Sequence, residues 1–198
     1  MIEQANSLLA LMRDYAQTGD YWKSIPLARE YYQLIEQMLD DPDVEWNDTL
    51  AFCDAIFLEE LLMQRDVPRL CLRFLALRNR ILSRPHPTAS EEYQEHHLPE
   101  NEAQAYLEKL TSYIDPATRM QDWAQRYQVF LLFDPVEMTP RWEEVIFEVE
   151  CECERLLADQ PRGMGFCFSY WSTKRAVLAR HGIQWKSPGQ MNPRVMFD

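Results

Sequence analysis

The sequence predicts an all-α fold, and three observations support this prediction. Glycine occurs once in the first 162 residues of the 198-residue chain, at Gly19, and prolines recur where helices are expected to start or stop. Apolar residues recur at intervals of three and four. The apolar content of 46%, with six Trp, is sufficient for a buried core. We therefore expect helices stacked as antiparallel hairpins.

The N-terminal part is expected to form two of these hairpins. Gly19 is suited to end the first helix, because glycine adopts the left-handed conformation that often follows a helix. An acidic loop from Asp40 to Asp48 follows the second helix. Asp66 can cap the fourth helix, with Pro68 in its first turn. The helical spacing predicts helices over 2–16, 25–39, 50–61 and 68–81.

A short pattern surrounds the first turn. It consists of Leu8, Leu11, Tyr15, Gly19, Asp20, Tyr21, Ser24 and Ala28. This stretch resembles the turn region of a tetratricopeptide repeat, in which a small residue lets two helices cross closely. The next turn has Arg65, Asp66 and Val67 in place of the glycine, so no repeat period is established. The resemblance implies a stacked helical-hairpin architecture and assigns no binding residues.

The middle of the chain contains further helix signals. Residues 83–100 are rich in prolines, acids and histidines and are expected to form a surface loop. The pairs Asp115–Pro116 and Thr139–Pro140 are typical of helix starts. Residues 147–153 also alternate as a strand would, but length and capping favour a helix. We expect helices over 103–114, 116–131 and 140–157.

Composition changes sharply after residue 162. Residues 1–162 carry 15 basic and 31 acidic side chains and are expected to form an acidic helical body. Residues 163–198 carry five basic side chains and one acid, with four of the five glycines. We expect them to form a compact aromatic and basic module packed on that body. Residues 166–171 are expected to form a short strand or an aromatic lead-in, after which Ser172 caps a basic helix.

Acidic residues suggest where a partner would bind. Glu144, Glu148 and Glu152 follow at four-residue intervals on one helix, and such like-charged pairs are mutually repulsive. Either the basic module or a basic partner protein could offset this repulsion. The aromatic side chains near the acidic loop, Trp22, Tyr31, Tyr32 and Trp46, could anchor such a partner or could equally belong to the core, and periodicity does not decide between the two. The predicted partner-binding residues are Trp22, Asp40, Asp41, Asp43, Glu45, Trp46, Asp48, Glu144, Glu148 and Glu152.

The C-terminal module offers an alternative site for a small molecule or a reaction. Cys167, Ser169 or Ser172 could act as a nucleophile with His181 as base, although no catalytic signature surrounds them. A buried thiol and ordinary helix residues explain the same positions. This alternative pocket would lie between the body and the module and would comprise Cys167, Tyr170, Trp171, Lys174, His181 and Trp185.

Other functional classes have less support from the sequence. A metal site within Glu91, Glu92, Glu95, His96, His97 and Glu100 would need ligands that nothing fixes in space, so we expect no metal and no cofactor. The net charge of −12 disfavours nucleic acid and anionic lipid. No apolar stretch is long enough to span a membrane, and five scattered cysteines suit reduced thiols.

These observations predict a cytoplasmic, non-enzymatic interaction protein. Its acidic helical surface would bind and occlude a basic protein, as an immunity protein, an antitoxin or an adaptor would. An enzyme or small-molecule binder that uses the alternative pocket is the second hypothesis. Homo-oligomerisation stays open.

Overall fold

The computed structural model describes residues 1–84 and 97–197, and every regular element in these ranges is helical. The all-α prediction is therefore confirmed for the described part of the chain. The chain forms two compact units, residues 1–111 and 112–198. The predicted boundary between an acidic body and a basic module, after residue 162, lies inside the second unit and stays a prediction.

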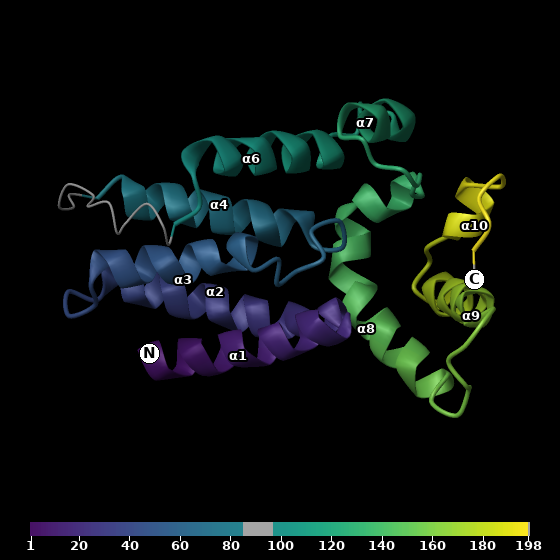
Figure 1. Cartoon of the computed structure of the whole chain (residues 1–198), viewed down its shortest axis with the longest axis horizontal. Helices are drawn as coiled ribbons and strands as arrows, with labels where there is room; N and C mark the ends of the chain where they lie inside the picture. Colours follow the sequence, from purple (N-terminus) through teal and green to yellow (C-terminus); the bar gives the residue numbers. More distant parts are fainter. Residues whose placement is uncertain (85–96, 198) are drawn as a thin grey trace. The chain divides into compact units, whose positions relative to one another are not determined.

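The first unit contains two helical hairpins, as predicted (Figure 1). The first hairpin consists of α1 (Ile2–Thr18) and α2 (Ser24–Asp40), joined by a short 3-10 turn (Tyr21–Lys23). Gly19 ends α1 with φ +77°, the left-handed conformation that glycine adopts at little cost. The second hairpin consists of α3 (Trp46–Leu58) and α4 (Pro68–Leu82). Stacking of α2 on α3 joins the two hairpins.

Aromatic side chains form much of this core. Phe74 of α4 lies 5.3 Å from the ring of Tyr32 and 6.3 Å from that of Tyr31, both on α2. The ring of Phe57 on α3 lies 5.2 Å from Tyr106 on α6 (Glu100–Ile114), which packs the fifth described helix onto the unit. Such ring pairs add stabilisation beyond the buried area.

The second unit begins with the end of α6 and contains α7 (Met120–Arg126), a 3-10 turn (Pro135–Met138) and α8 (Pro140–Leu156). Thr139 accepts a hydrogen bond from the backbone N–H of Trp142, so the predicted Thr-Pro start of α8 is confirmed. The alternating segment 147–153 is helical. The side chains that α7 buries pack with neighbouring residues in one cluster of Tyr113, Met120, Trp123, Ala124 and Met138.

Two predictions about the second unit are wrong. The helix expected over 116–131 begins only at Met120 and ends at Arg126, and Phe130 is 83% exposed instead of buried. The C-terminal helix α9 (Phe166–Arg180) begins before Ser172, at Phe166, with Gly165 preceding it at φ +81°. The expected strand or lead-in over 166–171 is therefore the first part of α9. A short helix, α10 (Pro188–Met191), follows with a capping box from Ser187 and Gln190.

Candidate interaction surface

The connection between α2 and α3 is short, acidic and locally ordered. Asp41 accepts a hydrogen bond from the backbone N–H of Asp43 at 2.9 Å, which is an Asx turn. Arg84, which follows the C-terminal end of α4, donates to the carbonyl of Leu39 and to the carboxylate of Asp40. These contacts hold the connection against α4 and neutralise Asp40, one of the predicted partner-binding acids.

Three other predicted acids have no such neutralisation. Asp43, Glu45 and Asp48 are exposed. None of the three forms an ion pair with any residue of the described ranges 1–84 and 97–197. Asp48 lies in the first turn of α3, where the helix dipole favours a negative charge. The result is an anionic edge whose charge is open to a binding partner.

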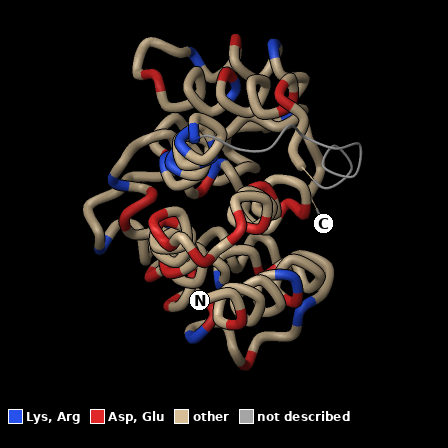
Figure 2. Tube along the Cα trace, turned by 90° about the vertical axis from the view of Figure 1, so that its left-hand side faces the viewer, with Lys and Arg blue, Asp and Glu red and all other residues tan. Residues whose placement is uncertain are grey.

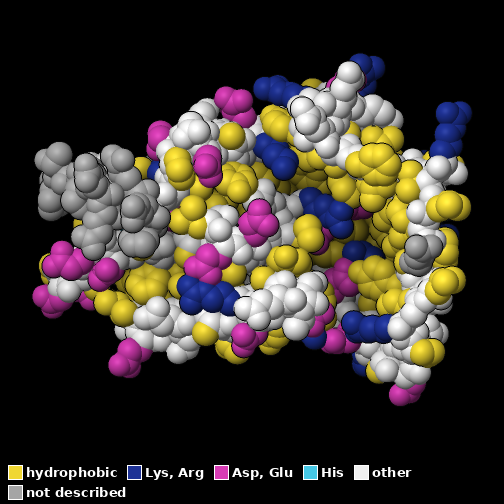
Figure 3. Space-filling model, in the orientation of Figure 1, with side chains coloured by type: hydrophobic (Ala, Val, Ile, Leu, Met, Phe, Trp, Pro, Cys, Tyr) yellow, Lys and Arg dark blue, Asp and Glu magenta, His cyan; other side chains and the backbone are white. Residues whose placement is uncertain are grey.

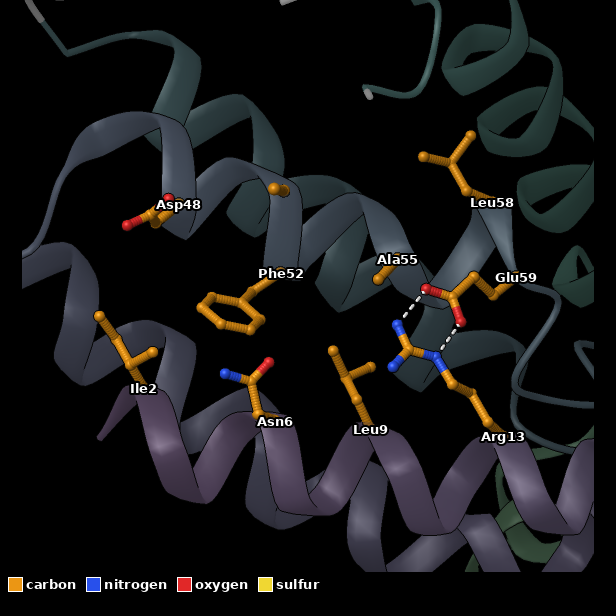
Figure 4. Close-up of a pocket in the computed structure, with 10 residues that line it drawn as sticks. Ile2, Asn6, Leu9, Arg13, Asp48, Phe52, Ala55, Leu58 and Glu59 are labelled. Carbon is orange, nitrogen blue, oxygen red and sulfur yellow. Dashed lines mark hydrogen bonds and ion pairs between the residues drawn. The ribbon is translucent and has the colours of Figure 1, made fainter. Parts of the chain in front are cut away.

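An open groove of about 400 Å³ begins at Asp48 and runs between α1 and α3 (Figure 4). The floor is largely apolar. Figure 4 shows Phe52 pointing from α3 toward Asn6 on α1, with Ile2 and Leu9 beside them. The remaining lining residues are Ala51, Ala55, Leu58, Arg13 and Glu59. Of this set, the sequence prediction had included only Asp48.

An ion pair closes the far end of the groove. The guanidinium of Arg13 contacts both carboxylate oxygens of Glu59, at 2.5 and 2.7 Å. The hydrogen bond that Arg13 donates to Glu59 raises the pKa of Arg13, although burial opposes the shift. Both side chains are partly exposed, so solvent screening limits the pair to at most about 1 kcal/mol. The groove thus has a neutral end at Arg13 and an anionic end at Asp48.

The predicted aromatic anchors near the acidic loop lie in different environments. Trp22 and Trp46 are half-buried, and the indole N–H of Trp46 donates to the carbonyl of Ile81 at 3.1 Å. Tyr31 and Tyr32 are only 0% and 6% exposed, so of the two alternatives for these residues the core position is correct and the surface anchor is not. The hydroxyl of Tyr31 donates to the carbonyl of Phe52, and burial raises its pKa.

The acidic stripe of α8 is partly neutralised within the second unit. Glu144 pairs with Arg141 at 3.1 Å. Glu152 pairs with Arg155 and with Arg180 of α9, and the hydrogen bond from Arg155 lowers its pKa. Glu148 is exposed, and no ion pair joins it to another described residue. One carboxylate of the three is therefore free for a partner in trans.

A buried ion pair joins α8 to α9 at part of the predicted alternative pocket. The ammonium of Lys174 donates to Glu150 at 2.6 Å, and the hydroxyl of Tyr170 donates to the same carboxylate. Burial raises the pKa of Tyr170. The rings of Trp142, Tyr170 and Trp185 surround Lys174 at 5.0 to 5.6 Å. This arrangement satisfies each charge internally.

The other residues of the alternative pocket serve different contacts. Trp171 packs on Phe197, with ring centroids 5.0 Å apart. His181 follows the last residue of α9, and Cys167 is half-buried in its first turn. No contact among the described residues joins Cys167 to His181. The structure brings Tyr170, Lys174 and Trp185 together and leaves the nucleophile–base hypothesis without a supporting contact.

A second buried charge cluster, which the sequence did not predict, lies in the first unit. Arg78 of α4 donates to Asp54 of α3 at 3.0 Å and to Glu100 at 2.8 Å. The backbone N–H of Leu98 donates to Asp54, and Nε2 of His97 lies 2.9 Å from Oδ1 of Asn47. These contacts fix the chain at residues 97–100 against α3 and α4. The signal for this cluster in the sequence was Asp54, an acid on the buried face of α3.

The histidine-rich segment lies mostly outside the described residues, which include only His97 and Glu100 of the six metal-ligand candidates. Within residues 1–84 and 97–197, no group of three His, Cys, Asp or Glu side chains could hold a metal ion. No helix in the same ranges combines the length and the apolar character needed to cross a membrane.

The acidic charge of the chain is concentrated in the first unit. Residues 1–111 carry 10 basic and 20 acidic side chains, a net charge of −10. Residues 112–198 carry 10 and 12, a net charge of −2. Figure 2 marks these positions along the trace, and Figure 3 shows acidic side chains gathered at the end of the first unit where α2 meets α3. Comparison with protein-family models, curated proteins and solved structures finds no match.

Proposed function

We propose that this chain is a non-enzymatic interaction module whose first unit binds a basic partner protein. The observation that carries this proposal is a set of three exposed carboxylates, Asp43, Glu45 and Asp48, that form no ion pair with a described residue, together with the open apolar groove that Asp48 lines at one end. Occlusion of a basic toxin by an immunity protein or antitoxin is one process that this mechanism would serve.

Charge and apolar surface would make different contributions to binding. The net charge of −10 on residues 1–111 would accelerate encounter with a cationic protein and would make association sensitive to salt. Charge alone supplies little affinity at an exposed surface. The apolar surface at Phe52 and Ile2 would supply the desolvated contact that holds the complex together.

The hypothesis of an enzyme or small-molecule site at Lys174 has less support. Glu150, Tyr170 and Lys174 are one another's partners, and Trp185 donates to Glu137 at 2.7 Å. A reacting group needs access to its substrate, whereas Lys174 and Trp185 are buried. A stabilising contact between α8 and α9 accounts for these residues.

Partner capture with charge-matched variants tests the proposed function. The tagged full chain is compared with an Asp43→Asn, Glu45→Gln, Asp48→Asn variant, using lysate of the source cells. An Asp14→Asn, Glu60→Gln, Glu102→Gln variant is the control, because it removes three exposed acids from the same unit. Thermal melts establish that all three proteins fold.

We expect the wild-type chain and the control to retain a basic protein that the first variant loses. Retention by both variants would show that these three acids are not the binding surface. The absence of any basic protein bound to folded wild-type chain would overturn the proposal.

A further inference from the structure

The groove between α1 and α3 has the length of a short helix. Ile2 and Arg13 are eleven positions apart on α1, and so are Asp48 in α3 and Glu59, the residue that follows α3. At about 1.5 Å per residue, each wall is about 16 Å long, or three helical turns. The two helices run in the same direction, with Ile2 near Asp48 and Arg13 paired to Glu59 (Figure 4).

The walls of the groove favour a helical occupant over an extended one. The backbone groups of α1 and α3 are paired within each helix, so the groove offers side chains and no row of free backbone donors and acceptors. An extended peptide would lose water from its amides without finding partners, which is costly. A helix satisfies its own backbone and needs only an apolar face to cover Phe52, Leu9 and Ile2.

The charge of the groove determines whether a basic or an acidic helix would bind. Glu59 neutralises Arg13, so the one lining charge without a partner among the described residues is Asp48. Glu45 and Asp43 precede it in the connection from α2 and are also exposed. A helix with Lys or Arg beside its apolar face would complement this edge, whereas an acidic helix would be repelled.

Resting on the proposed function above, we propose that the groove is the binding site for a basic amphipathic helix supplied by the partner protein. Its apolar residues, spaced i, i+3 or i+4, and i+7, would lie on Phe52, Leu9 and Ile2. Its basic residues would face Asp48 and the preceding acids. The proposal assigns the groove a ligand class, a basic helix of about three turns.

Two synthetic peptides of about fourteen residues test this assignment by fluorescence anisotropy with the full-length chain. One peptide combines Leu and Lys in an amphipathic helical pattern, and the other has Glu in place of Lys. Ala51→Trp fills the groove from α3, and Asn6→Lys places a cation in it from the exposed surface of α1. Asp48→Asn removes the anionic end. The matched controls are Gln33→Trp and Asp14→Asn, both exposed and outside the lining.

We expect saturable binding of the Leu–Lys peptide and at least tenfold weaker binding of the Leu–Glu peptide. Ala51→Trp should weaken binding of the Leu–Lys peptide about tenfold, and Asn6→Lys should weaken it about fivefold. Asp48→Asn should weaken it two- to fivefold, which is the range for the loss of an exposed charge pair. The two controls should stay within twofold of wild type. Asn6→Lys keeps the test valid if Ala51→Trp fails to fold, because Asn6 is exposed.

Three results would overturn the inference. Wild-type affinity of both Ala51→Trp and Asn6→Lys for the Leu–Lys peptide would show that the groove is not the binding site. Equal binding of the two peptides would remove the charge preference. Failure of folded wild-type chain to bind either peptide would reject a helical ligand. In each case the capture experiment, which depends on the three acids, would still decide the proposed function separately.

Discussion

Lys174 and Asp43 represent two opposite environments for a charge in this chain. Lys174 is buried, and Glu150 and the rings of Trp142, Tyr170 and Trp185 surround its ammonium. Asp43 is exposed, and no described residue of opposite charge pairs with it. A buried charge must be paired to be tolerated, so its pairing reveals a structural role. An exposed and unpaired charge near an apolar groove is available to a partner.

The buried pair leads to a stability prediction for Lys174→Met. The substitution leaves Glu150 buried without its cation, so the free energy of unfolding should fall by about 3 kcal/mol. Urea denaturation followed by circular dichroism measures the change. Glu150→Leu combined with Lys174→Met should recover much of the loss, because it removes both charges.

The control for this prediction is Arg175→Gln, which changes an exposed cation one position along α9 and should shift stability by less than about 0.5 kcal/mol. An effect of Lys174→Met no larger than that of Arg175→Gln would show that the pair contributes little.

Cys153 leads to a prediction about alkaline pH. Burial raises the pKa of this thiol from 9.0 to about 12, and its side chain is 1% exposed. The unfolded chain therefore releases this proton at lower pH than the folded chain does. The stability from the protonated thiol is complete below pH 9 and is lost as the pH rises from 9 toward 12.

Cys153→Ala isolates this effect in urea titrations at pH 8 and pH 10. Wild-type chain should lose about 1 kcal/mol more stability than the variant between these pH values. Equal losses in the two proteins would show that Cys153 ionises normally in the folded chain. Cys167, a free and half-buried cysteine in the first turn of α9, provides the matched Cys167→Ala control.

Among the elements, local signals predicted some helix boundaries correctly, but the N-cap of α4 is Val67 and not the expected Asp66, and no helix begins at Asp115–Pro116. Gly19 ends α1, and Thr139 with Pro140 starts α8, because each effect arises within one turn of chain. Periodicity could not place Tyr31 and Tyr32, because two consecutive residues both lie on the wide buried face of α2. It also could not start α9 correctly, since Tyr170 and Lys174 must be one helical turn apart to reach Glu150 on α8.

The first hairpin turn gives a prediction at the element scale. Gly19→Ala should cost about 1 kcal/mol, because alanine is strained at φ +77°. No atom lies within 4 Å of the added methyl, so the cost comes from the backbone alone. Gly163→Ala also meets no atom within 4 Å but has no positive φ, so it should be nearly neutral. Thermal unfolding of both variants separates backbone strain from side-chain crowding, and equal melting temperatures would contradict the strain argument.

For the whole molecule, the sequence predicted an anionic partner surface but not the groove. The net charge of a segment follows from its residues alone, so the acids of 40–48 could be recognised without knowledge of the fold. The groove combines Ile2, Asn6 and Leu9 of α1 with Phe52 of α3, residues that only the stacking of two hairpins brings together. The pairing of Arg13 with Glu59 across 46 positions was hidden for the same reason.

The distribution of long-range contacts also determines what a chain ending at Arg162 would do. Residues 163–198 supply the Lys174 ammonium to Glu150, the Trp185 indole to Glu137 and the Asn192 amide to the carbonyl of Leu132. Removal of this segment leaves two buried carboxylates without those partners and exposes Trp142 of α8. A compositional boundary at residue 162 would predict an intact acidic body, whereas these contacts predict a destabilised second unit.

Hydrogen exchange measured by mass spectrometry distinguishes these two predictions. In the chain ending at Arg162, amides of α8 should lose most of their protection, because the helix no longer has α9 to cover its apolar face. Amides of α2 and α4 in the first unit should keep protection close to that of the full chain. If α8 is equally protected in both chains, residues 1–162 form an independent body and the C-terminal segment is an appendage. Loss of protection in α8 but not in the first unit would instead show that α8 and α9 fold as one unit. The truncation would then damage only the second unit and leave the acidic first unit, with its groove, folded.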